Sequence, residues 1–304
     1  LSAFLYCCFS NIKCSTGALG AGLSLGALGG RPARAAEKVK LSTPSAEKLG
    51  WAVSCAQYTF RRFTLYETLD MLAELGIRCV EPAFFLRLDK KRPKLQVNQS
   101  LSAELRKELK ARLADRGIKM ASFYSRLGAD EAAGCKTYDL AKEMDVETIV
   151  SELPAAAFDV IEKLCDEYRI NLAVHNHPKK PNYTYWDPEG VAAVCKGRSK
   201  RIGACCDTGH WVRSGLDVVA CLKKLEGRIT SMHLKDVAEW GKPAARDVPL
   251  GTGKANYTAV LAELKRQGFQ GIMAIEYEHD SPELIQDVAQ CVAFVEKTSK
   301  ELAG

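Results

Sequence analysis

The strongest constraint on the fold is an alternation that begins at residue 51 and continues toward the C-terminus. Short, uniformly apolar runs of strand length alternate with longer runs in which apolar residues recur with helical spacing. Strands this apolar are buried on both faces, as in a parallel sheet covered by helices. The eight expected strands are residues 51–57, 77–82, 118–124, 146–152, 170–175, 201–207, 228–233 and 271–276.

Eight strand–helix units in about 250 residues have the number and size of a (β/α)₈ barrel. The sequence therefore predicts an α/β protein with a single TIM barrel domain over residues 49–304. The alternative is a doubly wound open sheet. It is disfavoured because the first strand runs into Gln57-Tyr-Thr-Phe60 and not into a glycine-rich phosphate turn. A capping box, Thr64-Leu-Tyr-Glu67, predicts the start of the first barrel helix, and Gly76 predicts its end.

The first 36 residues differ in character from the rest. An uncharged run rich in Gly, Ala and Leu precedes Ala33-Arg-Ala35, which fits a signal-peptidase site with cleavage before Ala36. We expect residues 1–36 to be a signal-peptide-like leader and residues 37–48 to be a linker. The run is too short and too rich in glycine for a stable membrane span. A genuine leader predicts an exported, periplasmic protein. A disordered tail is the alternative, and it predicts a cytoplasmic protein.

Charge and cysteine usage narrow the range of partners. The formal net charge of +6 is modest for 304 residues. Lys and Arg are scattered and form no basic stripe with interleaved aromatics, so we expect no nucleic-acid partner. The twelve cysteines include no Cys-x-x-Cys pair, and most fall in strand-like or helix-like runs, which predicts reduced core residues. The sequence leaves a homo-oligomer open.

Four of the expected strands end in a side chain that can bind a metal: Glu152, Asp207, His233 and Glu276. Because chemistry in a parallel barrel lies where the strands end, these four should meet at one rim. Each alone could be a solvated loop residue. Together, the three carboxylates would repel one another, and burying them unpaired would cost several kcal/mol. Oxygen-rich ligation with one imidazole suits one divalent ion, Mn²⁺, Mg²⁺, Co²⁺ or Zn²⁺. Small or apolar residues lie two positions before each candidate, on the same face: Val150, Cys205, Ser231 and Ala274.

Three motifs contain most of these candidates: Cys206-Asp-Thr-Gly-His210, Ser231-Met-His-Leu-Lys-Asp236 and Ala274-Ile-Glu-Tyr-Glu278. They resemble signatures of the xylose isomerase-like TIM barrel superfamily, which holds sugar phosphate isomerases and epimerases, inosose dehydratases and endonuclease IV enzymes. The likeness spans roughly residues 49–302. It implies that the four residues are metal ligands. It also implies that Glu152 and Glu276 move protons, as in the epimerase-type members.

The resemblance also suggests substrate contacts. His210 lies where the family's Asp-x-x-His pattern supplies a substrate-binding histidine, and a surface histidine is the alternative. His175-Asn-His177 resembles the His-Asn-His run of inosose dehydratase-like members. Both histidines are candidates for substrate binding, and we favour His177, nearer the rim, as the one that faces a sugar, with a structural role for both as the alternative. Glu81, which ends the second strand, is a further candidate for substrate binding.

Lys235 is a candidate catalytic residue, because it could hold a substrate oxyanion or donate a proton. Asp236 is its expected partner, and a surface ion pair between the two is the alternative. Pro249-Leu-Gly-Thr-Gly253 resembles the glycine loop that these proteins carry after the seventh strand. It is either a phosphate-binding loop or a plain turn.

The predicted function is a divalent-metal-dependent isomerase or epimerase of a sugar or keto-sugar, which abstracts a proton next to a carbonyl through a metal-stabilised enediolate. Ala155-Ala-Ala-Phe158 stands where ketose 3-epimerase relatives carry an additional substrate glutamate. The alternative is therefore a dehydratase or lyase acting on a keto-inositol or 3-keto-glycoside. A non-catalytic sugar-binding barrel is an alternative of another class. Endonuclease IV chemistry is disfavoured, since it needs a three-zinc cluster with more ligands than a chain with five histidines offers.

Overall fold

The computed structural model describes residues 40–304. The expected leader, residues 1–36, lies outside the described residues. Within residues 40–304, no helix combines the length and apolar character that a membrane crossing requires.

All eight expected strands are present, and their ends differ from the predicted bounds by two residues at most. The parallel sheet consists of β1 (Trp51–Ala56), β2 (Cys79–Glu81), β3 (Lys119–Met120), β4 (Ser122–Tyr124), β5 (Thr148–Ser151), β6 (Asn171–His175), β7 (Ile202–Asp207), β8 (Ile229–Leu234) and β11 (Gly271–Ile275). A separate antiparallel pair follows β8 and consists of β9 (Asp236–Val237) and β10 (Asp247–Val248).

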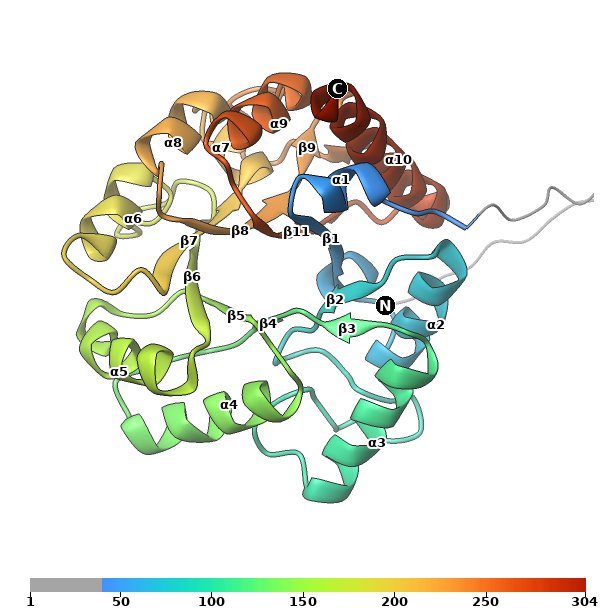
Figure 1. Cartoon of the computed structure of the whole chain (residues 1–304), viewed down its shortest axis with the longest axis vertical. Coiled ribbons are helices and arrows are strands. Elements are labelled where there is room, and N and C mark those ends of the chain that lie inside the picture. The colour runs from blue at the N-terminus through green and yellow to red at the C-terminus, as the bar shows by residue number, and fades with distance from the viewer. Residues whose placement is uncertain (1–39) are drawn as a thin grey trace, which may run out of the picture. The chain divides into compact units, whose positions relative to one another are not determined.

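The sheet closes on itself. Its strand order is β3-β2-β1-β11-β8-β7-β6-β5-β4. The two end strands, β3 and β4, are consecutive parts of the third barrel strand and are separated only by Ala121. Tyr124 N donates to Pro82 O, and Phe84 N donates to Tyr124 O, both at 2.9 Å, which joins β4 to the end of the second barrel strand. Figure 1 shows the resulting ring of strands with helices around its outside. The predicted (β/α)₈ barrel is confirmed, and an open doubly wound sheet is excluded.

The helices cover the outside of the ring. They are α1 (Pro44–Lys48), α2 (Leu65–Leu75), α3 (Ala103–Asp115), α4 (Glu131–Glu143), α5 (Phe158–Tyr168), α6 (Pro188–Cys195), α7 (Thr208–Arg213), α8 (Val218–Lys224), α9 (Tyr257–Arg266) and α10 (Leu284–Ala303), with two 3₁₀ turns, η1 (Gln57–Phe60) and η2 (Ala155–Ala157). The capping box at α2 is confirmed: Thr64 N donates to Glu67 Oε2 (3.0 Å), and Glu67 N donates to Thr64 Oγ1 (3.3 Å). Gly76 ends α2 with φ of 85°, and a Cβ there would lie 2.4 Å from Leu41 O.

Two elements differ from expectation. The short helix α1 lies in the stretch that we expected to be a linker, and Ser45 N and Ala46 N donate to the carboxylate of Glu296 on α10. Helix α7, which the hydrophobic periodicity does not predict, begins directly at the end of β7. Asp207 Oδ1 accepts from His210 N at 2.8 Å, so the predicted metal ligand also caps this helix.

The interior of the barrel holds a small separate cluster of Val150, Ala173 and Cys205, with Tyr124 packed against it. These residues stand two positions before Glu152, His175 and Asp207, which places a layer of small and apolar side chains directly below the rim. The nine cysteines of residues 40–304 are all free, and seven are buried, as expected for reduced core residues.

Candidate active site

Seven of the eight barrel strands carry a polar side chain at or next to their C-terminal end, and these ends form one rim of the barrel. The seven residues are Glu81, Tyr124, Glu152, His175, Asp207, His233 and Glu276. The register of the parallel strands places these residues at the same height in the barrel, since Asp207 pairs with His233, and His233 pairs with Ala274. Contacts of 3.9 Å or less connect all nine predicted site residues into one network.

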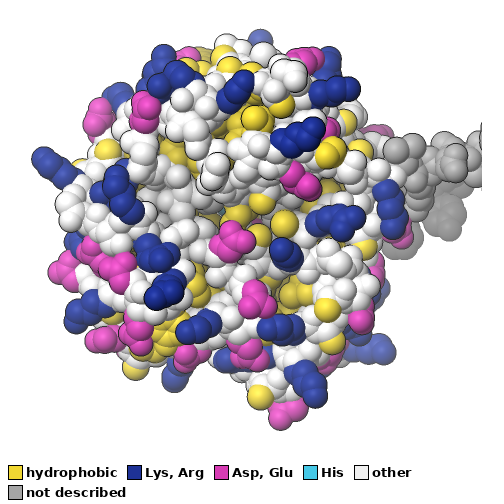
Figure 2. Space-filling model, in the orientation of Figure 1, with side chains coloured by type: hydrophobic (Ala, Val, Ile, Leu, Met, Phe, Trp, Pro, Cys, Tyr) yellow, Lys and Arg dark blue, Asp and Glu magenta, His cyan; other side chains and the backbone are white. Residues whose placement is uncertain are grey.

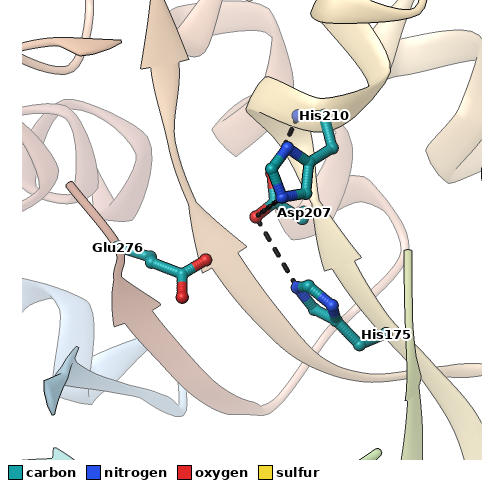
Figure 3. Close-up of side chains that lie close together, drawn as sticks. All are labelled: His175, Asp207, His210 and Glu276. Carbon is teal, nitrogen blue, oxygen red and sulfur yellow. Dashed lines mark hydrogen bonds and ion pairs between the residues drawn. The ribbon is translucent and has the colours of Figure 1, made fainter. Parts of the chain in front are cut away.

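At the centre of the network, His175, Asp207, His210 and Glu276 offer ligand atoms that all lie within 4.8 Å of one another. Figure 3 shows Asp207 between the two imidazoles, with the Glu276 carboxylate facing them from β11. Asp207 Oδ2 lies 3.7 Å from His175 Nε2 and 3.6 Å from His210 Nε2. All four residues are buried. This group includes two of the four predicted metal ligands, and it brings in two histidines that we expected to bind substrate.

His233 is held between two carboxylates. Its Nε2 lies 2.7 Å from Glu81 Oε1, and its Nδ1 lies 3.0 Å from Glu276 Oε2. Burial alone would lower the pKa of His233, but Cys205 and the two carboxylates outweigh burial and raise it well above its usual value. Glu81, expected at the substrate, therefore contacts a predicted metal ligand. Its other oxygen accepts from Ser122 Oγ at 2.6 Å.

Glu152 belongs to a second group with His175 and His177. Its Oε1 lies 2.6 Å from His177 Nδ1 and accepts from Tyr124 OH at 2.8 Å. Burial opposes the charge, but the two histidines outweigh burial and hold the pKa of Glu152 well below its usual range. For His175 too, burial opposes the charge. Asp207 and Glu152 outweigh it and raise the pKa of His175 to about 9. Three of the four predicted ligands, Glu152, Asp207 and Glu276, are thus divided between two groups that share His175, and His233 belongs to neither group.

Lys235 lies in the middle of the acidic residues and is fully buried. Its Nζ is 2.9 Å from Asp207 Oδ2, 2.9 Å from Glu276 Oε2 and 3.1 Å from Glu278 Oε1. Burial works against the charge, but these acids prevail and raise the pKa of Lys235 well above its usual value. The ammonium group is therefore a permanent cation of the site.

The expectation that Asp236 pairs with Lys235 is wrong. The Asp236 carboxylate accepts hydrogen bonds of 2.9–3.0 Å from four backbone amides, those of Val237, Gly251, Gly253 and Ala255. The glycine loop after β8 therefore wraps around an internal carboxylate. Its inward amides at Gly251 and Gly253 are already used, which favours a turn over a phosphate-binding loop at this place.

Three residues that sequence reasoning did not assign also shape the site: Tyr124, Arg213 and Glu278. Tyr124 ends the third barrel strand and Glu278 lies two residues past Glu276, so the rule of strand ends could have found both. Arg213 lies on α7, one turn past His210. It donates to Glu278 Oε2 at 2.7 Å and forms an ion pair with Asp247.

Two cationic groups, those of Arg213 and Lys235, contact the ring of His210. Arg213 Nη1 lies 3.2 Å from His210 Nδ1. A guanidinium group only donates, which favours Nδ1 as an acceptor, but the Lys235 ammonium group also only donates and lies 3.4 Å from Nε2, which favours Nε2 as an acceptor. Burial lowers the pKa of His210 well below its usual value, so the ring is neutral. A neutral imidazole has one N–H group, which can donate to a substrate, and one lone pair, which can bind a metal ion.

A pocket of about 210 Å³ opens over the network. Three aromatic residues line it, Tyr58, Phe85 and Tyr124, and the ring of Phe85 contacts the other two edge to face. The acidic and imidazole side chains that line it are Glu81, His175, His177, Glu276 and Glu278. The predicted substrate residues His175, His177 and Glu81 therefore line this pocket.

On the face of the molecule seen in Figure 2, Lys and Arg are interspersed with Asp and Glu.

The charge balance of the network favours a cation. Two permanent cations, Lys235 and Arg213, face six carboxylates, an excess of four negative charges that falls to two when His175 and His233 are protonated, as their raised pKa values favour. The six are Glu81, Glu152, Asp207, Asp247, Glu276 and Glu278. Both ring nitrogens of His175 are buried without a hydrogen bond, whereas Oδ2 of Asp207 is held by the Lys235 ammonium group at 2.9 Å. Ring nitrogens without a partner are costly to bury unless a proton or a metal ion engages them. The donor set fits a divalent ion bound by oxygen and imidazole.

The sequence profile of the xylose isomerase-like TIM barrel family matches residues 69–297. The chain belongs to this family. Among solved structures, an uncharacterised protein of Parabacteroides distasonis is 33% identical, with a TM-score of 0.65, over 82% of this chain and 99% of that one.

Two further proteins are similar to this chain. An inosose dehydratase of Mesomycoplasma hyopneumoniae is 33% identical over 133 residues, which are 39% of this chain and 44% of that relative. This chain therefore spans less than half the length of that relative in the match. The structure of an IOLI protein with a bound zinc atom has a TM-score of 0.58 over 83% of this chain and 97% of that one. At 18% identity, that likeness shows the fold alone.

Proposed function

We propose that this protein is a divalent-metal-dependent isomerase or epimerase that acts on a sugar or keto-sugar by moving a proton next to a carbonyl group. The observation that carries the proposal is the buried cluster of carboxylates and imidazoles beneath a small pocket at the C-terminal rim of the barrel. A pocket of about 210 Å³ is smaller than the 300–1,000 Å³ typical for drug-sized ligands, which suits a small polar substrate.

Asp207, Glu276 and His175 would hold the metal, because the first two carry charge at the centre of the cluster and the third has unengaged nitrogens. Glu152 and His233 remain predicted ligands, and each would exchange a contact that it makes here, with His177 and with Glu81 or Glu276. A divalent ion at this place would polarise the carbonyl group and make the neighbouring C–H more acidic. The zinc of the IOLI structure makes Zn²⁺ the first ion to test.

The chain's own residues supply the proton transfer. Glu152 is ionised, accepts one hydrogen bond from Tyr124 OH and is the candidate base, and it would become a stronger base when its contact with His177 is exchanged for substrate. Glu276 lies across the cluster from it, on a non-adjacent barrel strand, and is the second proton carrier. Lys235 is a donor that can return a proton or hold a developing negative charge, and His210, beside it, is a second candidate donor. General acid–base catalysis of this kind contributes about 10²–10⁴-fold.

A dehydratase is the second candidate, and the specific observation behind it is the 33% identity to an inosose dehydratase. The same base could remove a proton next to a carbonyl group, and a donor such as Lys235 could then protonate a leaving hydroxyl group. For either reaction we propose an unphosphorylated substrate, because the amides of the glycine loop are used by Asp236.

The test has two steps. Metal analysis of the purified protein comes first, followed by incubation with ketohexoses and inososes in heavy water with the metal restored. Deuterium incorporation into recovered sugar supports an isomerase or epimerase, and formation of an enone or diketone with loss of water supports a dehydratase. Sugar binding without exchange or loss of water would identify a non-catalytic barrel and refute the proposal.

A further inference from the structure

The Lys235 ammonium group stands where the two central carboxylates converge. It contacts Asp207 Oδ2 and Glu276 Oε2, each at 2.9 Å, and those two oxygens belong to the candidate metal ligands. A metal ion that bound both oxygens would lie within a few ångströms of a positive charge. Repulsion between a divalent and a monovalent cation at such a distance is large inside a protein. The ion and the ammonium group therefore cannot both bind these carboxylates as tightly as either would alone.

The backbone and the first carbons of the Lys235 side chain are held in place, so only the ammonium end of the side chain can move when a metal ion binds. The Lys235 backbone N donates to Thr208 Oγ1 (3.1 Å), and Thr208 Oγ1 donates to Lys235 O (2.8 Å). The side chain then crosses Gly209, where an added Cβ would lie 2.5 Å from Lys235 Cγ. Thr208 and Gly209 belong to the same Asp-Thr-Gly-His run that supplies Asp207. This run thus supplies one candidate ligand and also positions the competing lysine.

A third carboxylate, that of Glu278, can still pair with the Lys235 ammonium group after the ammonium group leaves Asp207 and Glu276. Glu278 Oε1 lies 3.1 Å from the ammonium group, and Glu278 is outside both candidate metal clusters. Its other oxygen accepts from Arg213 at 2.7 Å. Glu278 also lines the substrate pocket. A lysine end that leaves Asp207 and Glu276 but stays with Glu278 therefore faces the pocket.

We infer that Lys235 is an internal counter-cation of the metal site, and that a divalent ion binds by displacing its ammonium group from Asp207 and Glu276 toward Glu278. The inference rests on the proposed metal dependence. In the metal-free protein the lysine neutralises carboxylates that would otherwise repel one another. In the metal-loaded protein it becomes a proton donor at the pocket. Occupation of the site would in this way control whether the catalytic lysine is available.

The test is the affinity of the chelator-stripped full chain for Zn²⁺ and Mn²⁺, measured by isothermal titration calorimetry without any substrate. Lys235→Met and the polar variant Lys235→Gln should each bind at least about tenfold more tightly than wild type, because no ammonium group opposes the ion. Lys254→Met, an exposed lysine on the loop after β8, is the matched control and should change affinity by less than about twofold, since exposed charges are screened. Equal or weaker binding by both Lys235 variants overturns the inference.

A second arm does not depend on the Lys235 variants folding. Glu278→Gln should weaken metal binding by at least about threefold, because the displaced ammonium group loses its remaining carboxylate. Unchanged or tighter binding in this variant contradicts the displacement. Where Lys235→Met folds, the effect of Glu278→Gln should vanish in the double variant. If wild type and all variants bind neither ion, the metal dependence itself fails, whereas binding by wild type with no gain on removing the lysine refutes the displacement alone.

Discussion

At the scale of single residues, Glu276 contacts two cationic groups at once, the Lys235 ammonium group at 2.9 Å and His233 Nδ1 at 3.0 Å. Glu276→Gln keeps the size of the side chain and removes its charge. We expect deuterium exchange into substrate to fall by at least about 10²–10⁴-fold, the usual contribution of an acid–base group, while cooperative unfolding persists. Glu301→Gln, exposed on α10, is the control and should exchange like wild type. Wild-type-like exchange in Glu276→Gln would remove this residue from the mechanism.

Gly209 makes a second prediction at the same scale. An added Cβ would lie 2.5, 2.7 and 2.9 Å from Cγ, Cδ and Cβ of Lys235. Because the lysine stem is buried, it cannot move into solvent, and we expect Gly209→Ala to destabilise the fold by about 1–3 kcal/mol through overpacking. Urea unfolding measures this. In Gly128→Ala the new Cβ meets no heavy atom within 4 Å, so stability should change by no more than about 0.5 kcal/mol. Equal stabilities of the two variants would show that Lys235 does not need the space.

The positions of the site residues were predictable, but their partners were not. Placing Glu152, Asp207, His233 and Glu276 at one rim requires only that parallel strands end together. Which atoms then meet depends on side-chain rotamers and on loop paths, which leave no trace in strand periodicity. This is why Asp236 was assigned to its sequence neighbour Lys235.

At the scale of structural elements, the loop between β8 and α9 is held by one carboxylate. Asp236 accepts from four backbone amides, two on each oxygen. Asp236→Asn keeps the shape but turns one oxygen into a donor, which leaves two buried amides without an acceptor. Each such loss costs about 1–3 kcal/mol. We expect a lower unfolding midpoint and faster hydrogen exchange at Gly251 or Gly253.

Asp217→Asn is the matched control for this loop. Asp217 caps α8 through one amide, that of Ala220, and is exposed. Since Asn is also a good helix cap, this variant should remain close to wild type. Similar hydrogen exchange in the Asp236 and Asp217 variants would mean that the carboxylate does not hold the loop.

Elements differ in how strongly the sequence encodes them. Helix α2 was bounded correctly because Thr64, Glu67 and Gly76 carry local hydrogen-bonding and backbone signals. Helix α7 is only six residues long and begins at a charged strand end, so its periodicity is too short to detect. The β9–β10 pair has two residues in each strand and is specified by tertiary contacts. Short elements around the site were therefore the least predictable part of the fold.

At the scale of the whole molecule, the barrel concentrates charge at one rim, with a layer of small and apolar residues beneath it. Lys235 and Arg213 offset only part of the negative charge, so the metal-free fold carries residual repulsion. A ligand that binds only the folded state at 100 times its Kd stabilises it by about 2.7 kcal/mol.

For a barrel of this size, that stabilisation corresponds to a rise in Tm of roughly 5–10 °C. We therefore expect chelator-stripped protein to unfold at a lower temperature than protein with saturating Zn²⁺, as measured by differential scanning calorimetry. Asp207→Asn should lose most of this shift, because it removes a central charged ligand without changing the size of the side chain. A shift of the same size in wild type and in Asp207→Asn would place the stabilising ion elsewhere on the protein. The same experiment with Mg²⁺, Mn²⁺ and Co²⁺ ranks the ions, because at equal concentration the tightest ligand gives the largest shift.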